Sequence, residues 1–332
     1  MYDDPFEELI GDRSYRFLGD PHSVPNGPRR LVEPPDPSGN EYMFVDDLRT
    51  HSLPYGRGLD GGFDLRLDTD DHRVIEMIIN AIPAPLYRHD GLSDAFRDYI
   101  EMALTLLSRG TLYLEIEFYR ESDEPNSRPV AFRLEALSPE LIQTAKFGKT
   151  FYWQPASDRN VEPDHWTREL LDPARLIAVA LRRHLRRAVD GALRTVQIAD
   201  QDLDVMQKFT LGKEGRGSGF DLQEYQRRSR DIVLRETREM GWSGRGLLTE
   251  GLLDPMKAWR AIRFARLVAK LRDVALDGLQ EAIARAGHEI GFEATISLSG
   301  VLTQTDLDRL QNELGSGTTP MAELLNPSVR KA

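Results

Sequence analysis

The chain has 332 residues, no cysteine, and 54 acidic against 43 basic side chains, which gives a formal net charge of −11. The lack of cysteine excludes a disulfide framework, a thiol nucleophile and a thiolate metal site. The acidic balance argues against a protein whose whole surface binds nucleic acid tightly. No apolar run reaches the roughly 18 residues that a membrane span needs, and the acidic N-terminus MYDDPFEELIGD is unlike a signal peptide, so we expect a cytoplasmic protein.

Residues 1–60 carry eight of the 19 prolines. Proline without helical periodicity favours extended, turn-rich backbone. Seven aromatic residues in the same stretch are too many for a simple disordered tail. We therefore predict an extended N-terminal arm over residues 1–60 that packs on its own chain or on a neighbouring subunit.

Residues 61–171 predict an α/β region that starts with a strand at 63–67 and a helix from about Asp70. Four potential metal ligands lie between them: Asp68, Asp70, Asp71 and His72. A calcium loop starting at Asp68 would need glycine and glutamate where this chain has Arg73 and Ile79. Helix capping explains the acidic residues, and we predict neither a metal nor any other cofactor.

A second helix is predicted over residues 92–109, with Ser93 as its cap and Gly110 just past its end. Two strands follow at 111–119 and 129–137, each with one apolar face. We expect a third strand at 149–153 to complete one small antiparallel sheet.

Glu115 and Glu117 alternate with apolar residues on the first of these strands. Paired carboxylates are typical of a metal-dependent nuclease or hydrolase, but the sequence shows no converging aspartate with a lysine or histidine. We favour an exposed strand face for both, with antiparallel pairing that brings Arg133 near one of them.

Two further patterns resemble catalytic motifs without completing them. Gly148-Lys149-Thr150 ends like a phosphate-binding loop, but Gln143 stands where that loop has its first glycine. The stretch around Ser243 resembles a nucleophile elbow, but Arg245 replaces its last glycine. We therefore predict that the protein is not an enzyme.

Residues 172–240 predict stem-like helices and a glycine loop. The run 176–181 is compatible with a buried strand or with the start of a helix, and a helix is expected from His184 to about Ala199. The densest basic cluster in the chain lies here: Arg182, Arg183, Arg186 and Arg187. Guanidinium groups pair with phosphates without reading sequence, so this cluster is a candidate DNA contact, the alternative being a solvated or inter-subunit face.

The stretch 211–219 is rich in glycine and is predicted to be a mobile loop. It carries the cations Lys213 and Arg216. A capping box at Asp221 and Glu224 then predicts a helix to about Met240, closed by Gly241.

The clearest helix lies within residues 241–290 and runs from Asp254 to Gly287. Its predicted buried face holds seven residues: Phe264, Leu267, Val268, Leu271, Val274, Ala275 and Leu279. Its predicted charged face holds six others: Arg263, Arg266, Lys270, Asp273, Asp277 and Glu281. The basic residues precede the acidic ones, which opposes the helix macrodipole, and the three acidic residues repel one another at i, i+4 spacing. Opposite charges on a neighbouring element or subunit would offset this, and solvent screening is the alternative.

Residues 291–332 predict a strand at 294–302 and a helix opened by the capping box of Thr303 and Asp306. These elements complete an α+β fold.

Five local patterns in this order resemble the portal proteins of tailed bacteriophages, over about residues 90–325. They are LSRGTLYLE at 107–115, LEALSPE at 134–140, FTLGK at 209–213, the spacing R-x-x-R-F-A-R-x-x-x-x-L-R from Arg260 to Arg272, and the polar stretch from Ser299 to Leu314. The resemblance implies a portal-like fold with stem and channel helices, a small mainly antiparallel wing or clip sheet, and a crown-like region at 291–332.

The resemblance also implies a function. Portal proteins form rings, usually of twelve subunits, at one capsid vertex of the virion, and are assembled in the host cytoplasm. The ring conducts double-stranded DNA and docks the large terminase and the head-tail adaptor beside the major capsid protein. We expect no membrane partner. The alternatives are a metal-dependent nuclease or hydrolase and a virion scaffold that forms no ring.

One of two loops, 211–219 or 241–246, is expected to project into the channel. Their cations, Lys213 and Arg216 or Arg245, would contact phosphates without sequence preference. Surface turns far from the ring axis are the alternative.

Overall fold

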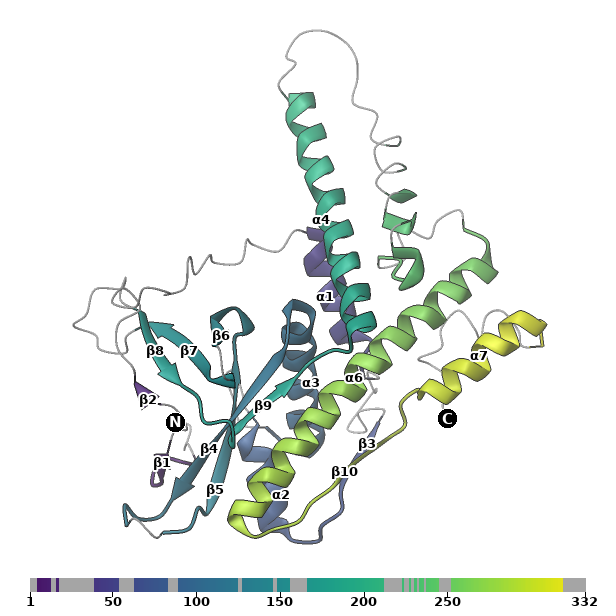
Figure 1. The fold of residues 1–332 in the computed structure, drawn as a ribbon. Helices are drawn as coiled ribbons and strands as arrows, with labels where there is room; N and C mark the ends of the chain where they lie inside the picture. The colour runs from purple at the N-terminus through teal and green to yellow at the C-terminus, as the bar shows by residue number, and fades with distance from the viewer. Residues whose placement is uncertain are drawn as a thin grey trace. The chain divides into compact units, whose positions relative to one another are not determined.

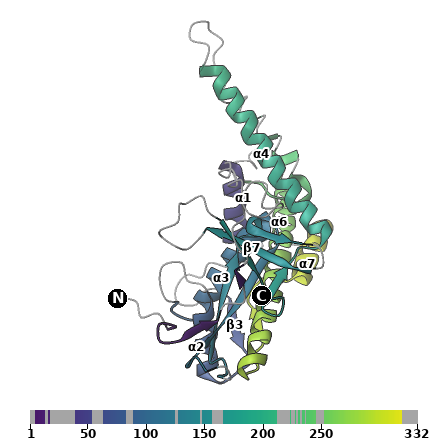
Figure 2. The ribbon, with the colours of Figure 1, turned by 60° about the vertical axis from the view of Figure 1, so that its left-hand side comes forward.

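The computed structural model describes residues 5–12, 16–17, 39–53, 63–82, 89–124, 127–145, 148–155, 166–211, 223, 227, 230–231, 233–235, 237–244 and 252–318. As predicted, the fold is α+β, with long helices and small antiparallel sheets (Figures 1 and 2). The chain divides into two compact units. The first comprises Met1–Glu33, Asp64–Ala180 and Asp273–Ser299, and the second comprises Pro34–Phe63, Leu181–Arg272 and Gly300–Ala332.

The first unit is built around strand β4 (Leu112–Arg120). Strand β5 (Ala131–Leu137) pairs along one edge of β4, and Glu117 lies opposite Arg133 as predicted. The other edge is shared by β9 (Leu176–Val179), which pairs with the first half of β4, and β1 (Ile10–Asp12), which pairs with its end. The open choice for residues 176–181 is thus settled as a strand.

A second sheet in this unit has the order β2-β8-β7-β6. Its strands are β2 (Arg16–Phe17), β6 (Ile142–Thr144), β7 (Thr150–Pro155) and β8 (Trp166–Leu170). The prediction that residues 149–153 join the sheet of β4 and β5 is therefore wrong. The short turn η2 (Pro139–Leu141) directly after β5 redirects the chain, because proline has no N–H to continue a strand ladder.

Two helices pack with the sheet of β4. Helix α2 (His72–Ala81) is capped by Asp71, whose Oδ1 accepts the Arg73 N–H at 2.9 Å, in agreement with the capping interpretation of this acidic cluster. Helix α3 (Leu92–Arg109) ends before Gly110 as predicted. The helix begins at Leu92 as predicted, but the predicted cap Ser93 is wrong: the cap position is two residues earlier, at Gly91, with no side-chain cap hydrogen bond.

A short two-stranded sheet joins distant parts of the sequence. Strand β3 (Asp64–Leu67) pairs antiparallel with β10 (Ile296–Ser299). Both strands agree with the sequence prediction, and their pairing brings the residues after helix α6 (Asp254–Ile290) back to the start of the α/β region.

The second unit contains helices α1 (Gly39–Thr50), α4 (Arg183–Leu211), α7 (Gln304–Ser316) and the short η4 (Thr237–Glu239). Helix α1 lies within the predicted extended arm, so that interpretation is wrong for residues 39–50. The densest proline cluster ends at Pro37, and the i, i+4 pair Phe44 and Leu48 then supplies the apolar side of a helix, where both are fully buried.

Helix α6 contains 37 residues, about 55 Å at 1.5 Å per residue. Six residues of its predicted buried face are buried, and Val274 is half-buried. The predicted end at Gly287 is wrong, because the helix continues to Ile290 and Gly291 has the positive φ, 98°. Gly287 serves close packing instead, since an added Cβ would lie 2.3 Å from the Phe292 carbonyl oxygen.

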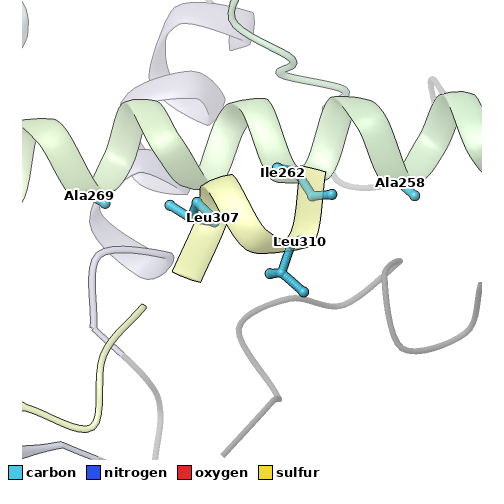
Figure 3. Close-up of a cluster of buried hydrophobic side chains, with 5 residues drawn as sticks. All are labelled: Ala258, Ile262, Ala269, Leu307 and Leu310. Carbon is cyan, nitrogen blue, oxygen red and sulfur yellow. The ribbon is translucent and has the colours of Figure 1, made fainter. Parts of the chain in front are cut away.

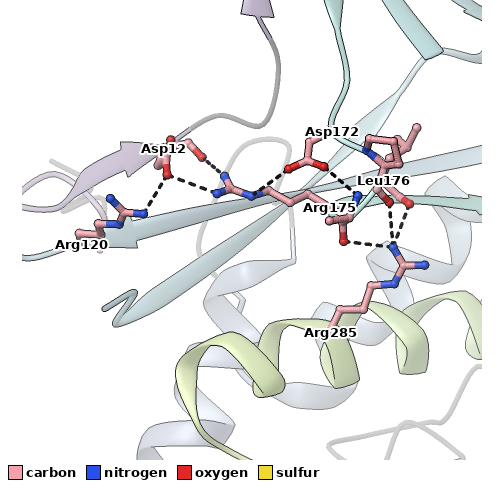
Figure 4. A network of polar contacts seen from close by, with 8 residues as sticks. Asp12, Arg120, Asp172, Arg175, Leu176 and Arg285 are labelled. Atoms are coloured by element: carbon pink, nitrogen blue, oxygen red, sulfur yellow. Dashed lines mark hydrogen bonds and ion pairs between the residues drawn. The ribbon is translucent and has the colours of Figure 1, made fainter. Parts of the chain in front are cut away.

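A polar network fastens β1 and the turn before β9 (Figure 4). The Asp12 carboxylate lies 3.1 Å from Arg120 Nη2 and 3.3 Å from Arg175 Nη2. Arg175 also donates to the Asp12 carbonyl at 2.8 Å, and Arg285 of α6 donates to the Leu176 carbonyl at 3.1 Å. The N-terminal segment is thus anchored by side chains as well as by three residues of strand pairing.

An apolar cluster joins α6 to α7 in the second unit (Figure 3). Its buried members are Ala258, Ile262, Ala269, Leu307 and Leu310. Helix α7 is opened by the predicted capping box, in which the Asp306 N–H donates to Thr303 Oγ1 and the Thr303 N–H donates to Asp306 Oδ2. Donation of the Thr303 hydroxyl to Asp306 Oδ2 at 2.7 Å, followed by that of the Thr303 N–H, holds the pKa of Asp306 below its ordinary value. No helix in the described ranges has the length and apolar composition that crossing a bilayer requires.

Replacing Leu310 by alanine is expected to reduce the free energy of unfolding by about 2–5 kcal/mol, because a fully buried leucine leaves a cavity. Urea unfolding followed by circular dichroism measures the change. Leu253→Ala is the matched control, since this leucine is 75% exposed and should change stability by no more than about 0.5 kcal/mol. Equal effects of the two substitutions would contradict the packing of α7 on α6.

Candidate nucleic-acid interface

The first half of α4 has one buried and one basic side. Leu185, Val189, Ala192 and Val196 are buried and fall within an arc of about 60° at 100° per residue. Arg183, Arg187 and Arg194 are exposed and fall within about 40° on the opposite side. The apolar stripe fixes the helix on its own unit and thereby directs three guanidinium groups outward as a row, here called the arginine row.

The arginine row has no counter-charge in the described part of the chain. Arg183, Arg187 and Arg194 form no ion pair with another described residue, and the same holds for the exposed Arg182. Arg186 differs, because its Nε donates to Asp190 Oδ1 at 2.8 Å. The predicted cluster is thus brought together at the start of α4, with one of its four members neutralised inside the chain.

The sequence interpretation missed Arg194. The signal was available, since Arg194 follows Arg183 by 11 residues, which is about three helical turns and returns to the same face. Arginines in the first turn oppose the helix macrodipole by about 0.3–1 kcal/mol each, and a bound polyanion would offset this cost. Guanidinium groups can contact phosphates without reading sequence, which suits a row on a net-acidic chain.

The other predicted DNA contacts, Lys213, Arg216 and Arg245, lie outside the described residues. The sequence predicts a helix from Asp221 to about Met240, closed by Gly241, and the structure describes the residues at this predicted end. Gly241 has φ 80°, and an added Cβ would lie 2.2 Å from the Arg260 carbonyl oxygen, so both conformation and space require glycine there.

Two of the six inter-subunit candidates on α6, Arg263 and Arg266, form ion pairs with acidic residues of their own chain. Arg263 Nη1 lies 2.8 Å from Glu239 Oε2, and its guanidinium stacks 4.5 Å from the Trp259 ring centroid. Arg266 Nη2 lies 2.6 Å from Asp308 Oδ1 on α7. Intrachain pairing therefore offsets part of the reversed charge order without a neighbouring subunit.

The other four members of this set are less uniformly paired. Glu281 forms an i, i+4 ion pair with Arg285, and the half-buried Asp273 also has a polar interaction. Lys270 is half-buried and Asp277 is exposed, and neither forms an ion pair with another described residue. These two are the members of the set that remain available to a second subunit.

The first arginine of the portal-like spacing, Arg260, is buried at 3% exposure. Its guanidinium donates to Ser243 Oγ, the Leu234 carbonyl, Thr237 Oγ1 and the Trp242 carbonyl. Burial lowers the pKa of Arg260 to about 10, which leaves it charged at neutral pH. Arg260 therefore organises the turn that contains η4, a role that the sequence pattern did not reveal.

The last arginine of the same spacing, Arg272, is also buried. Its Nη1 donates to the Ser52 carbonyl at 3.2 Å and its Nη2 to the Leu302 carbonyl at 2.9 Å. It thus ties the residues after α1 and before α7 to α6. Both ends of the portal-like spacing serve the chain's own fold in this structure.

The prediction of an exposed face for Glu115 and Glu117 is wrong. Their exposures are 1% and 6%, and Gly11 of the neighbouring strand β1 lies close to the Glu117 carboxylate. The Tyr119 hydroxyl donates to Glu117 Oε2 at 3.1 Å, and the Phe6 ring lies 4.4 Å from that of Tyr119. Burial, followed by the Glu117 charge, raises the pKa of Tyr119 to about 12.

Close packing leaves little room beside Glu117. A Cβ added at Gly11 would lie 2.9 Å from Glu117 Oε1. Glu117 is therefore enclosed by β1, and a buried, hydrogen-bonded carboxylate is poorly placed to meet a substrate. Within the described ranges, no group of three or more histidine, aspartate or glutamate side chains is arranged to hold a metal ion.

Comparison of the chain with models of known protein families finds no matching family, and comparison with curated proteins finds no match.

Replacing Arg183, Arg187 and Arg194 together by alanine is expected to weaken binding of double-stranded DNA equally for unrelated sequences. The slope of log K against log salt concentration should become shallower by about 0.9 for each phosphate that the variant no longer neutralises. Fluorescence anisotropy with labelled DNA at several salt concentrations measures both effects.

The matched control replaces three exposed arginines elsewhere, Arg73, Arg109 and Arg309, and so changes the net charge by the same amount. Equal decreases in affinity in the two triple variants would mean that total charge governs binding, and would remove the case for the arginine row.

Proposed function

We propose that this chain is a portal protein of a tailed bacteriophage, one subunit of a closed ring that conducts double-stranded DNA during packaging and ejection. The observation that carries the proposal is the arginine row, which presents three arginines without a counter-charge among the described residues on a chain of net charge −11. Such a surface can attract DNA locally while the acidic remainder limits tight binding.

The order of elements supports the proposal. The sheet region is followed by the 29-residue α4, then by the 37-residue α6, and finally by β10 and α7. This is the order in which the five portal-like sequence patterns occur. The ring would lie at one capsid vertex of the virion, after assembly in the host cytoplasm, with the large terminase, the head-tail adaptor and the major capsid protein as partners.

A ring would also give partners to charges that the chain leaves unpaired. In a head-to-tail ring every subunit presents the same two surfaces to its neighbours. Lys270 and Asp277 have opposite charges and form no ion pair within the described residues, so each is available to a neighbour. A ring of twelve, usual in the family that the chain resembles, is our proposal for the subunit number.

We further propose that the protein is a conduit and has no catalytic activity of its own. The burial of Glu115 and the enclosure of Glu117 by β1 support this, because the competing nuclease or hydrolase hypothesis needs carboxylates that reach a substrate. The other alternative, a virion scaffold without a ring, differs from the proposal in particle size.

Purified protein is expected to form closed rings of about twelve subunits, because head-to-tail interfaces between identical chains close into rings when the rotation permits. Mass photometry gives the particle mass, and negative-stain electron microscopy shows the ring. The charge reversals Lys270→Glu and Asp277→Lys test the proposed contact separately from the ring. A monodisperse monomer at every salt concentration would refute the ring.

No products are expected when the protein is incubated with DNA or nucleotides and Mg²⁺, Mn²⁺ or Zn²⁺. Gel electrophoresis of the DNA and chromatography of the nucleotides provide the measurement. Turnover that is abolished in Glu115→Gln or Glu117→Gln, with the circular dichroism spectrum unchanged, would favour the enzyme hypothesis instead.

A further inference from the structure

A histidine lies buried where α2 ends and α3 begins. His89 is 7% exposed, and its Nε2 lies 3.3 Å from the carbonyl oxygen of Ile82, the residue that ends α2. Its other ring nitrogen, Nδ1, faces the first turns of α3. There it lies 3.6 Å from Asp98 Oδ2 and 3.8 Å from Asp94 Oδ2. The His89 ring therefore lies between the end of α2, which its Nε2 faces, and the start of α3, which its Nδ1 faces.

Two atoms of this cluster have no hydrogen-bond partner in the described structure. His89 Nδ1 and Asp98 Oδ2 are both buried and unpaired. Leaving buried polar atoms unpaired is costly. A neutral imidazole that donates Nε2–H to the Ile82 carbonyl cannot pair its Nδ1 with a charged carboxylate, because two acceptors then face each other. One proton between these atoms would satisfy both once they approach from 3.6 Å to hydrogen-bond distance.

We propose that His89 and Asp98 share one proton, and that this proton acts as a pH-operated latch between the end of α2 and the first two turns of α3. The Ile82 carbonyl determines how the pair is arranged. Donation of Nε2–H to that carbonyl leaves Nδ1 as the acceptor of the neutral ring. The shared proton then either resides on the Asp98 carboxyl and is donated to Nδ1, or resides on Nδ1 and is donated to Asp98.

The groups around the pair shift the pKa of Asp98 in both directions. Burial is the largest influence and raises the pKa of Asp98, the His89 charge lowers it, the carboxylates of Asp94 and Glu101 raise it, and Arg97 lowers it. Asp94 is itself held by the backbone N–H of Asp90 at 3.2 Å. The net direction is upward, so this carboxyl retains a proton at higher pH than an exposed aspartate does.

Counting protons gives the sign of the pH dependence. In the unfolded chain the aspartate loses its proton near pH 3.9. In the folded chain Asp98 keeps its proton to a higher pH because its pKa is raised, chiefly by burial. The contribution to stability is therefore fully present below about pH 3.9 and is lost as the pH rises through the folded pKa of Asp98.

Asp98→Asn provides the sharpest test, because its amide N–H is a permanent donor to Nδ1 that no pH change removes. Urea unfolding of the full chain between pH 3 and 9 is measured for the parent, Asp98→Asn, His89→Gln and the control His288→Gln, which removes an exposed histidine from α6. In the parent and the control, the unfolding constant should rise by up to about tenfold per pH unit above about pH 3.9 until Asp98 ionises in the folded chain. In Asp98→Asn this component should disappear.

A second measurement does not depend on the variants folding. Nitrogen-15 shifts of the parent's histidine rings report how His89 Nδ1 is hydrogen-bonded or protonated, and hydrogen exchange reports the opening of residues 89–92. Loss of the proton and faster exchange at 89–92 should occur together. If Asp98→Asn folds and keeps the parental pH dependence, or if His89 titrates together with the histidines of the urea-denatured chain, the latch is refuted. Stabilisation of the parent by Zn²⁺ that His89→Gln abolishes would also refute it, because the pair would then hold a metal in place of a proton.

Discussion

A helix that is buried on most sides must find partners for its charged side chains inside the protein. Helix α6 is such a helix, and it meets this constraint with arginines aimed at backbone carbonyls. Arg260 and Arg272 are buried, yet their guanidinium groups donate to residues of distant segments, the turn at 234–243 and the residues at 52 and 302. Loss of either side chain would remove hydrogen bonds to two backbone carbonyls at once. The arginines of α6 thus hold the second unit together from within.

This constraint separates charges that maintain the fold from charges that face outward. On α6, Arg263 forms an ion pair with Glu239, and Arg266 forms one with Asp308. On α4, the apolar stripe supplies the attachment and the arginine row is left without described counter-charges. The two helices therefore have different roles in our proposal. Helix α6 provides the scaffold, and α4 provides the surface that meets a polyanion.

The sequence predicted those features that depend on local periodicity. The apolar repeat of α6 gave its start and its buried face, and the spacing of Thr303 and Asp306 gave the start of α7. It failed where burial is imposed by distant segments. Alternation places Glu115 and Glu117 on one face of β4, but it carries no information that the residues around Gly11 cover that face. In the same way, the sequence does not distinguish an arginine whose guanidinium donates to backbone carbonyls from an arginine that is exposed to solvent.

The shared edge of β4 affects how particle sizes should be interpreted. Three residues of β1 close the end of this edge, and the main-chain groups of Phe118 and Arg120 lie within that pairing. Proteolysis that removed the N-terminal segment would uncover an unpaired strand end beside apolar side chains, which is a template for strand addition between molecules. Open-ended aggregates of nicked chains would then accompany any closed ring. Intact mass should therefore be verified before a large particle is counted as an assembly.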